Sequence, residues 1–352
     1  MKKLPKLIFL ILSLYLTIRL VTNPAPCLDA AKNAVDLCLS TVIPSLFPFF
    51  VCSGLLLALG FSALCSRWLS PLMRPLFNLP GSGALTFVLG ILSGYPIGAA
   101  TSTELYLSGQ CTKTEAERML SFCNNSGPLF VIGVVGCGYL KNSALGTILY
   151  VSNLISAMLV GVVFRFYKAS SPSIPRLPSA ATANKKTAFF SLGQIIDNSV
   201  FSILKVCGFI IFFAVFTATL GDNPILYSFI EITGGIKALS LYKNPLIYPT
   251  ISFFLAFSGF SVMCQVWAIT SPHGLSLVPY VLGKLLQGIF SFGITKILLS
   301  LFPLSHQTFL QESPAFLSGH TPLSLMFSSV IASLFAALSL ILLMLFKAIK
   351  QK

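Results

Sequence analysis

The chain has 352 residues, of which 55% are hydrophobic and 9% are charged. Soluble domains carry about a quarter charged residues, so this composition excludes most soluble folds and indicates a polytopic integral membrane protein. The net charge of +14 comes from basic residues near both ends and in mid-chain, as cytoplasmic flanks of membrane spans would supply. A nucleic-acid partner is not expected, because it would need a continuous basic surface interleaved with aromatic residues.

The N-terminus, residues 1–27, combines a basic start with an apolar run, as a signal peptide does. Arg19 and the stretch Asn23-Pro24-Ala25-Pro26 make a poor cleavage site. We therefore expect residues 1–27 to remain attached as a signal-anchor helix.

Residues 28–167 are predicted to form a first membrane repeat. Its uncharged apolar segments are interrupted by Pro, Gly or a polar run, and they cover 37–66, 75–103 and 119–140. An unbroken predicted span, 143–164, closes the repeat. The breaks predict interrupted or re-entrant helices, because backbone polar groups in lipid must be satisfied inside the protein.

A Ser-, Pro- and Lys-rich stretch, 168–188, is predicted to be a basic cytoplasmic linker. Residues 189–352 form a second predicted membrane repeat. Its apolar parts are 206–220, 244–283, 284–302 and 323–346, with a loop over 303–321. At about 20 residues per crossing, the all-α fold would hold about eight to ten membrane segments, counting re-entrant ones.

Two matches in the same order predict that the two halves are related. Asp36 and Asp197 each open an apolar segment, and Ser93-Gly94-Tyr95 recurs as Ser258-Gly259-Phe260, at distances of 57 and 61 residues. Related halves with discontinuous helices are common in secondary transporters. Three cytoplasmic basic regions and one extra N-terminal span leave two alternatives: parallel repeats, or a segment that is re-entrant in one half and spanning in the other.

The segment 89–99 places glycines and a proline inside an apolar run. A helix break there would free backbone groups that can line a cavity. Tight packing through small residues is the alternative. The candidate substrate-lining residues of this segment and the arm that follows it are Ser93, Gly94, Tyr95, Pro96, Gly98 and Glu104.

A predicted capping box, Thr112 with Glu115, starts the next helix, and we expect Glu117 and Arg118 to be mostly solvated. Side-chain amides in the apolar sequence that follows are costly unless they meet a ligand, the backbone or one another. These candidates are Asn124, Asn125 and Ser126.

The second half supplies the remaining candidates. Asp197 lacks a close basic partner, whereas Asp36 has Lys32 one helical turn away. Glu231, Lys284 and Gln287 add polarity, but lysines near segment ends commonly snorkel to the interface, and none of these three is chosen. The candidates chosen are Asp197, Ser258, Gly259 and Gln265.

Catalytic motifs are absent from the sequence: there is no G-x-S-x-G, H-E-x-x-H, P-loop or G-x-G-x-x-G. The nine cysteines form no C-x-x-C pair and the three histidines are scattered, unlike the ligands of a zinc site. We therefore expect no enzymatic activity, no cofactor and no metal.

Four stretches carry a resemblance to a known family: PSLFPFFV (44–51), SPLMRPLFNLPGSGA (70–84), LSGYPIGA (92–99) and TEAERMLSFCNNSGPLFVIG (114–133). The chain resembles the YlbJ-type sporulation integral membrane proteins, most strongly over about residues 36–165, and through them the wider nucleoside-recognition or Gate-domain group. Asn125 and Gly127 depart from the Asn-Ser-Ser-Asn-Pro form of the family. The resemblance implies a role in spore formation, at the cortex or maturation stage, in a mother-cell or forespore membrane.

The predicted function is a transporter or channel-like component for a small polar solute in sporulation. The alternative is a non-transporting membrane scaffold for cortex-building enzymes, in which changes to the loops 168–188 or 303–321 would abolish function while polar substitutions within the membrane would be tolerated. Expected partners are the lipid bilayer, an unidentified solute, and either a second copy of the chain or other sporulation membrane proteins.

Overall fold

The computed structural model describes residues 3–59, 61–168, 191–220, 223–242, 244 and 246–302. Most of the predicted linker, the loop 303–321 and the predicted span 323–346 lie outside these residues. Within the described residues every regular element is helical, which confirms the all-α fold.

An N-terminal helix, α1 (Lys3–Thr22), precedes a first group of elements. The group comprises α2 (Pro24–Leu37), η1 (Cys38–Val42), α3 (Ile43–Ala58), α4 (Phe61–Phe77), α5 (Gly83–Leu92), α6 (Ile97–Leu107), α7 (Lys113–Phe122), η2 (Leu129–Tyr139) and α8 (Ser143–Phe164). α1 ends directly before Pro24, where the sequence placed the end of the anchor.

The second group follows the linker. It comprises α9 (Ser191–Ala218), α10 (Pro224–Ile230), α11 (Ile232–Leu239), α12 (Ile247–Phe257), α13 (Gly259–Thr270), η3 (Ser271–His273) and α14 (Val278–Leu301).

Several of these helices are long and apolar enough to cross a membrane. Among the described residues they are Ser143–Phe164, Leu192–Ala218, Ile247–His273 and Val278–Leu301. A fifth crossing, Pro24–Val42 with Leu46–Leu56, qualifies if its 49° bend lies within one span. The first has the bounds predicted from the sequence.

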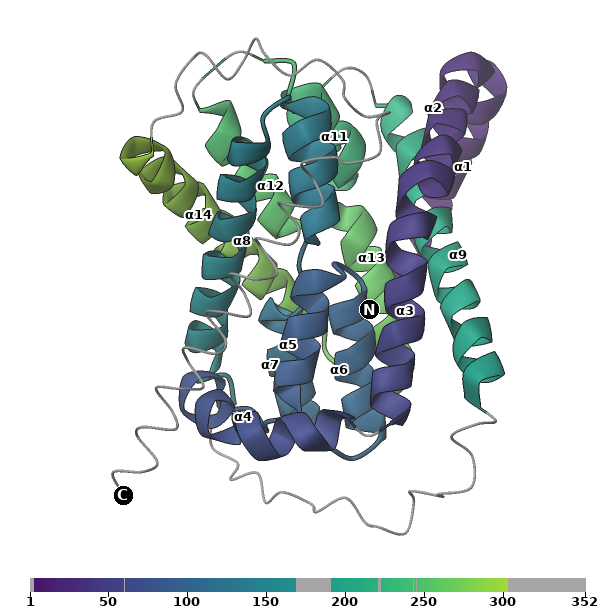
Figure 1. Ribbon diagram of the computed structural model, residues 1–352. Coiled ribbons are helices and arrows are strands. Elements are labelled where there is room, and N and C mark those ends of the chain that lie inside the picture. The colour runs from purple at the N-terminus through teal and green to yellow at the C-terminus, as the bar shows by residue number, and fades with distance from the viewer. Residues whose placement is uncertain are drawn as a thin grey trace. The chain divides into compact units, whose positions relative to one another are not determined.

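The order of elements in the first group recurs in the second. In each group a helical hairpin comes first, a helix broken in its middle comes next, and a long helix comes last: α5–α6, α7–η2 and α8, then α10–α11, α12–α13 and α14. The α5–α6 hairpin lies in the lower half of Figure 1 and α11 lies in the upper half. The two hairpins therefore point into the bundle from opposite ends.

This order corrects the pairing of motifs made from the sequence. Residues 93–96 form the tip of a hairpin, whereas Ser258 interrupts a helix. The counterpart of 93–96 is Glu231, between α10 and α11, and the counterpart of Ser258 is the break 123–128. Small residues suit either kind of break, so the shared tripeptide did not identify equivalent elements.

The second group is complete at α14, before the apolar segment 323–346. If that segment crosses the membrane as predicted, it returns the C-terminus to the side of the linker. A hairpin in each group together with one further crossing satisfies the positive-inside rule without parallel repeats.

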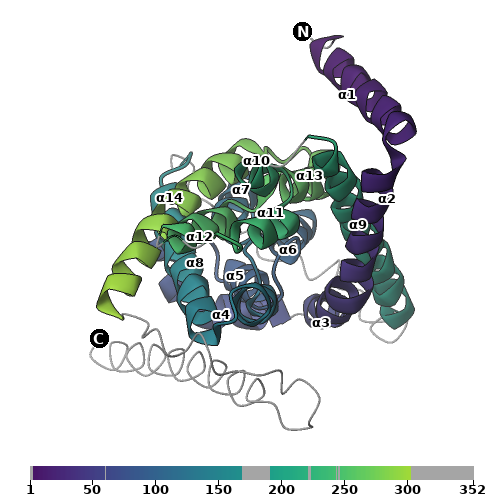
Figure 2. The same ribbon diagram turned by 90° about the horizontal axis from the view of Figure 1, so that it is seen from above.

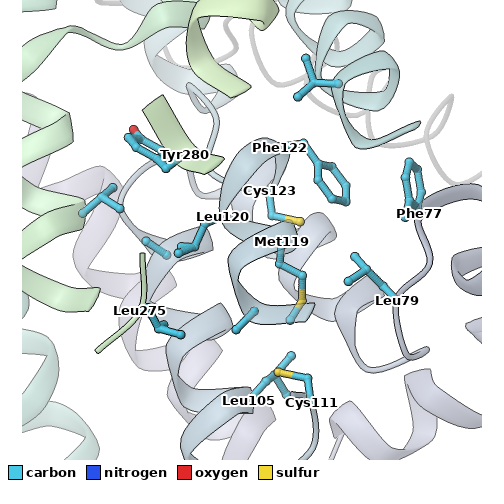
Figure 3. Packing of buried hydrophobic residues seen from close by; sticks show 14 of the residues in the cluster. Phe77, Leu79, Leu105, Cys111, Met119, Leu120, Phe122, Cys123, Leu275 and Tyr280 are labelled. Carbon is cyan, nitrogen blue, oxygen red and sulfur yellow. The ribbon is translucent and has the colours of Figure 1, made fainter. Parts of the chain in front are cut away.

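A hydrophobic cluster fixes the first hairpin against the helices that follow it. Figure 3 shows Phe77, Phe122, Met119 and Leu105 of this cluster. The rings of Phe77 and Phe122 stack with centroids 4.9 Å apart. Burying aromatic side chains contributes most of the apolar area in such a contact, so α4, α6 and α7 are held as one packed layer.

Arg118 and Glu117 are buried, contrary to the prediction that they are solvated. The Arg118 guanidinium donates to the carbonyl oxygens of Asn78 (2.8 Å), Tyr167 (2.8 Å) and Lys168 (3.0 Å). Guanidinium forks suit such convergent acceptors. Arg118 therefore ties α7 to the ends of α4 and α8.

Glu117 links the two groups of helices. One carboxylate oxygen accepts the Ser276 N–H at 3.0 Å, and the other lies 3.4 Å from Lys168 Nζ. The pKa of Lys168 is raised by its hydrogen bond with Tyr167 first and by the Glu117 carboxylate second. The predicted capping box of Thr112 and Glu115 on the same helix is confirmed.

Candidate functional site

A cavity of about 90 Å³ lies where the tips of both hairpins meet the broken helices. We call it the central cavity. Ser93, Gly94 and Tyr95 reach it from the α5–α6 tip, and Gly127 reaches it from the break after α7. Glu231 and Thr233 reach it from the α10–α11 tip, and Ser261 and Gln265 reach it from α13.

The α5–α6 tip turns sharply at Gly94, whose φ of +85° is disfavoured for residues with a Cβ. A Cβ built at Gly94 would lie 2.8 Å from the Gly127 nitrogen. Because the two backbones are this close, no side chain separates the hairpin tip from the break after α7. The tip therefore presents backbone to the cavity.

The arms of this hairpin are equally close to the same break. Cβ atoms built at Gly90 and Gly98 would overlap the carbonyl of Cys123. The packing explanation for these small residues is therefore correct for Gly90 and Gly98, while Gly94 both packs and lines the cavity. The hydroxyls of Thr101, Ser102 and Thr103 bond to carbonyls within α6.

Asn124, Asn125 and Ser126 lie behind the wall of the cavity and hold the break in place. Asn124 Oδ1 accepts the Ala99 N–H at 3.3 Å, and its Nδ2 lies 3.4 Å from the Tyr280 hydroxyl. Ser126 Oγ donates to the carbonyl of Leu255 at 2.9 Å and lies 3.3 Å from the Tyr95 hydroxyl. These side chains join the first group of helices to the second.

Asn125 belongs to a network that contains a fully buried lysine. Lys284 Nζ donates to Gln287 Oε1 (2.7 Å) and Asn125 Oδ1 (3.2 Å). Gln287 Nε2 donates to Asn125 Oδ1 (2.9 Å) and Asn153 Oδ1 (2.7 Å). The prediction that Lys284 snorkels is wrong, because it points into the bundle and joins α14 to α8 and to the break after α7.

Glu231 is the acidic member of the central cavity. It caps α11, with one carboxylate oxygen accepting the Thr233 N–H (2.9 Å) and the other accepting the Gly234 N–H (2.7 Å). Its side chain is 5% exposed. A carboxylate at a helix N-terminus is favoured by the exposed amides and the helix dipole, and each oxygen keeps a lone pair for a further donor.

Three buried polar groups around the cavity have no hydrogen-bond partner in the protein: Ser93 Oγ, Ser261 Oγ and Gln265 Oε1. Each residue is at most 4% exposed. Buried polar groups are nearly always paired with protein or water, because leaving them unpaired costs roughly 1–3 kcal/mol each. Three together around one cavity indicate a site for a polar occupant.

The opposite wall of the cavity is apolar. Leu46 and Phe49 come from α3, Phe130 from η2, and Val206 and Ile210 from α9. The cavity can therefore contact apolar surface on one side and hydrogen-bonding groups on the other, as small-molecule sites commonly do.

The remaining candidates lie elsewhere. Pro96 and Glu104 line a second cavity of about 210 Å³, which Gln265 shares. Ser258 is hydrogen-bonded to Tyr280, and Gly259 packs against the carbonyls that end α10. Asp197 is exposed on α9 and lines none of the three described cavities.

The sequence analysis did not select Glu231, Thr233 or Ser261. Ser261 and Gln265 are four residues apart on one helix and so share a face, a signal that could have found Ser261. Glu231 followed by Thr233 and Gly234 reads as a helix start, but sequence could not place it at a hairpin tip. Among the described residues no group of three His, Cys, Asp or Glu could hold a metal ion.

Comparisons with known proteins match this architecture to two descriptions. A family model described as Gate, nucleoside recognition, matches residues 39–179. The sporulation integral membrane protein YlbJ of Bacillus subtilis (strain 168) is 33% identical over 321 residues, covering 79% of each chain. No solved structure matches.

Proposed function

Since the chain belongs to the family of YlbJ-type sporulation integral membrane proteins, we propose that it carries a small polar solute across a membrane of the sporulating cell and that the central cavity binds this solute. The observation that supports the proposal is the group of unpartnered side chains, Ser93, Ser261 and Gln265, around that cavity. Broken helices that meet at a polar cavity are the usual binding site of secondary transporters.

The charges around the cavity narrow the class of solute. Glu231 is the charged residue among the described residues that line it, and none of them is Lys, Arg or His. An acidic, poorly hydrated site repels anions. The solute is therefore neutral or cationic, with hydrogen-bonding groups on one side and an apolar face against Phe49 and Phe130.

A non-enzymatic role is part of this proposal. The polar side chains of the cavity offer hydrogen-bond partners, and no described nucleophile there has an adjacent general base of the kind covalent catalysis uses. The solute is needed for spore cortex formation or maturation, and the protein acts in the mother-cell or forespore membrane.

The small-molecule content of developing spores tests the proposal. Mass spectrometry should find one solute or chemical class depleted in spores that lack the protein and restored by the wild-type chain. Gln265→Leu should fail to restore it at normal membrane abundance. Phe260→Leu, on the same helix but 52% exposed and outside the three cavities, should restore it.

Unchanged small-molecule content in spores that still fail to mature would contradict transport and support the scaffold alternative. That alternative also places the essential residues in the loops 168–188 and 303–321, so replacing those loops with Gly/Ser-rich sequence should then abolish maturation. Under transport, loop replacement that preserves membrane abundance leaves solute content normal.

A further inference from the structure

Two further cavities extend from the central cavity along one side of the bundle. The second cavity, of about 210 Å³, shares Val206 and Gln265 with the central one. A third, of about 400 Å³, shares Phe50, Glu104 and Ser202 with the second. Shared lining residues make the three cavities neighbours in a row.

The row follows α9 and α6 in order. Along α9 the third cavity touches Gln194 to Ser202, the second touches Ser202 to Phe209, and the central cavity touches Val206 and Ile210. From Gln194 to Ile210 the helix rises roughly 24 Å at 1.5 Å per residue, most of the thickness of a hydrocarbon core. The row ends at the first turn of α9, on the face where α8 ends in Figure 1, which we call the linker face.

The lining of the third cavity is suited to water and not to lipid. Nine of its fourteen lining residues are polar, including Glu104, Gln194 and Asn198. Polar and charged groups facing hydrocarbon are strongly disfavoured. α9 nevertheless presents apolar residues such as Val200 and Leu204 on its other exposed surface.

The opposite side of the central cavity is closed by packed side chains. Val131 and Val135 of η2 and Ile236 of α11 are fully buried in one hydrophobic cluster with Leu239 and Phe254. Figure 2 shows α11 over this part of the bundle. Polar cavities lie on one side of the central cavity, and hydrophobic core lies on the other.

We propose that the three cavities form one water-filled path between the linker face and the central cavity, bounded by α6 and α9, and that the structure is the state open to that face. The proposal rests on the proposed function for what travels along the path. The path itself can be tested without knowing the solute.

Cysteine reactivity in membrane vesicles tests the path. Ser202→Cys and Ala100→Cys, which line the second and third cavities, should react with a charged, membrane-impermeant methanethiosulfonate added on the linker side. Val200→Cys, which is exposed on α9 but lines none of the three cavities, should react at least about tenfold more slowly, because thiolates form poorly in apolar surroundings. Peptide mapping separates each new site from the native cysteines.

A double variant tests continuity. Ser93→Cys in the central cavity should react from the linker side, and prior attachment of a bulky thiol reagent at Ser202→Cys should slow that reaction. Equal rates at 200 and 202, labelling from the other side alone, or a Ser93→Cys rate unaffected by the block would overturn the path. Expected labelling with unchanged spore solutes would preserve the path and overturn the proposed function.

Discussion

The two hairpins enter the bundle from opposite ends but bring different chemistry to the central cavity. The α5–α6 tip spans residues 93–96 and presents backbone with the Ser93 hydroxyl, whereas the α10–α11 tip is the single residue Glu231. The first tip is shaped by glycines packed on a neighbouring loop. The second is shaped by a carboxylate that caps the next helix. Equivalent positions in the order of elements thus divide recognition, with charge from one half and hydroxyl and backbone groups from both.

The largest effect is expected where each hairpin is closest to its neighbour. A Cβ at Gly98 would overlap the Cys123 carbonyl, and a Cβ at Gly235 would overlap the backbone of Ser228. Gly98→Leu and Gly235→Leu should each lose more than about 3 kcal/mol, because backbone cannot yield as side chains do. Membrane abundance and monodispersity in detergent should fall sharply for both.

Gly208→Leu is the control for these variants, since a Cβ at Gly208 meets nothing within 4 Å. It should accumulate like the wild type. A monodisperse Gly98→Leu protein would show that the first hairpin is less tightly seated than the second.

The next effect concerns the network behind the first hairpin. Asn125→Leu removes an acceptor from Lys284 and a partner from Gln287, and should cost about 1–3 kcal/mol through unpaired buried groups. Lys284→Met should cost less, because an apolar side chain of similar length leaves no unpaired charge. Thermal unfolding in detergent measures both.

A double variant separates the network from simple packing. If the two residues interact, the loss in Asn125→Leu with Lys284→Met should differ from the sum of the single losses by about 0.5–3 kcal/mol. Additive losses would mean that Lys284 does not depend on the first hairpin's support.

The fold was largely readable from the sequence, because breaks in apolar runs need Gly, Pro or polar residues and these are visible. The span over 143–164 and the capping box at Thr112 are local features, and both were predicted correctly. Arg118 and Lys284 were misjudged for a common reason. Their partners lie 40 to 50 and 159 residues away, respectively, apart from Gln287 on the same helix as Lys284, and no local pattern reports such contacts.

The site was predicted in part. Ser93, Gly94, Tyr95 and Gln265 line the central cavity, because a helix break in an apolar run is itself a sign of a cavity. Asp197 was chosen for lacking a partner on its own helix, yet an exposed carboxylate needs none. Sequence could not separate it from Glu231, whose importance comes from its place at a hairpin tip.

Glu231 allows the charge of the second hairpin to be separated from its capping role. Glu231→Ala removes the cap of α11 and should cost about 0.5–2 kcal/mol in thermal unfolding. Glu231→Gln keeps one oxygen able to accept an amide N–H, so it should cost less. Both should deplete the spore solute if that solute is cationic.

A neutral solute gives a different result in the same assay, because Gln can still hydrogen-bond it. Normal solute content with Glu231→Gln but not with Glu231→Ala would therefore assign a neutral solute. Normal content with both would remove Glu231 from the site and leave the two hairpins without a difference in recognition.

The smallest effect on stability, and the sharpest test of function, is expected for the two unpartnered serines. Ser93 Oγ at the first tip and Ser261 Oγ on α13 have no partner in the protein, so Ser93→Ala and Ser261→Ala remove no protein hydrogen bond. Thermal stability should stay equal or rise slightly, because an unsatisfied buried group is lost. Spore solute content should nonetheless fall, since each hydroxyl is retained for the solute. Ser300→Ala, whose exposed hydroxyl bonds to Ile297 within α14, is the matched control and should leave both measurements unchanged. If Ser93→Ala and Ser261→Ala destabilise the fold, the hydroxyls are bonded within the protein and the central cavity loses its main support as a binding site; if stability and solute content are both normal, neither hairpin tip nor α13 contacts the solute through these groups.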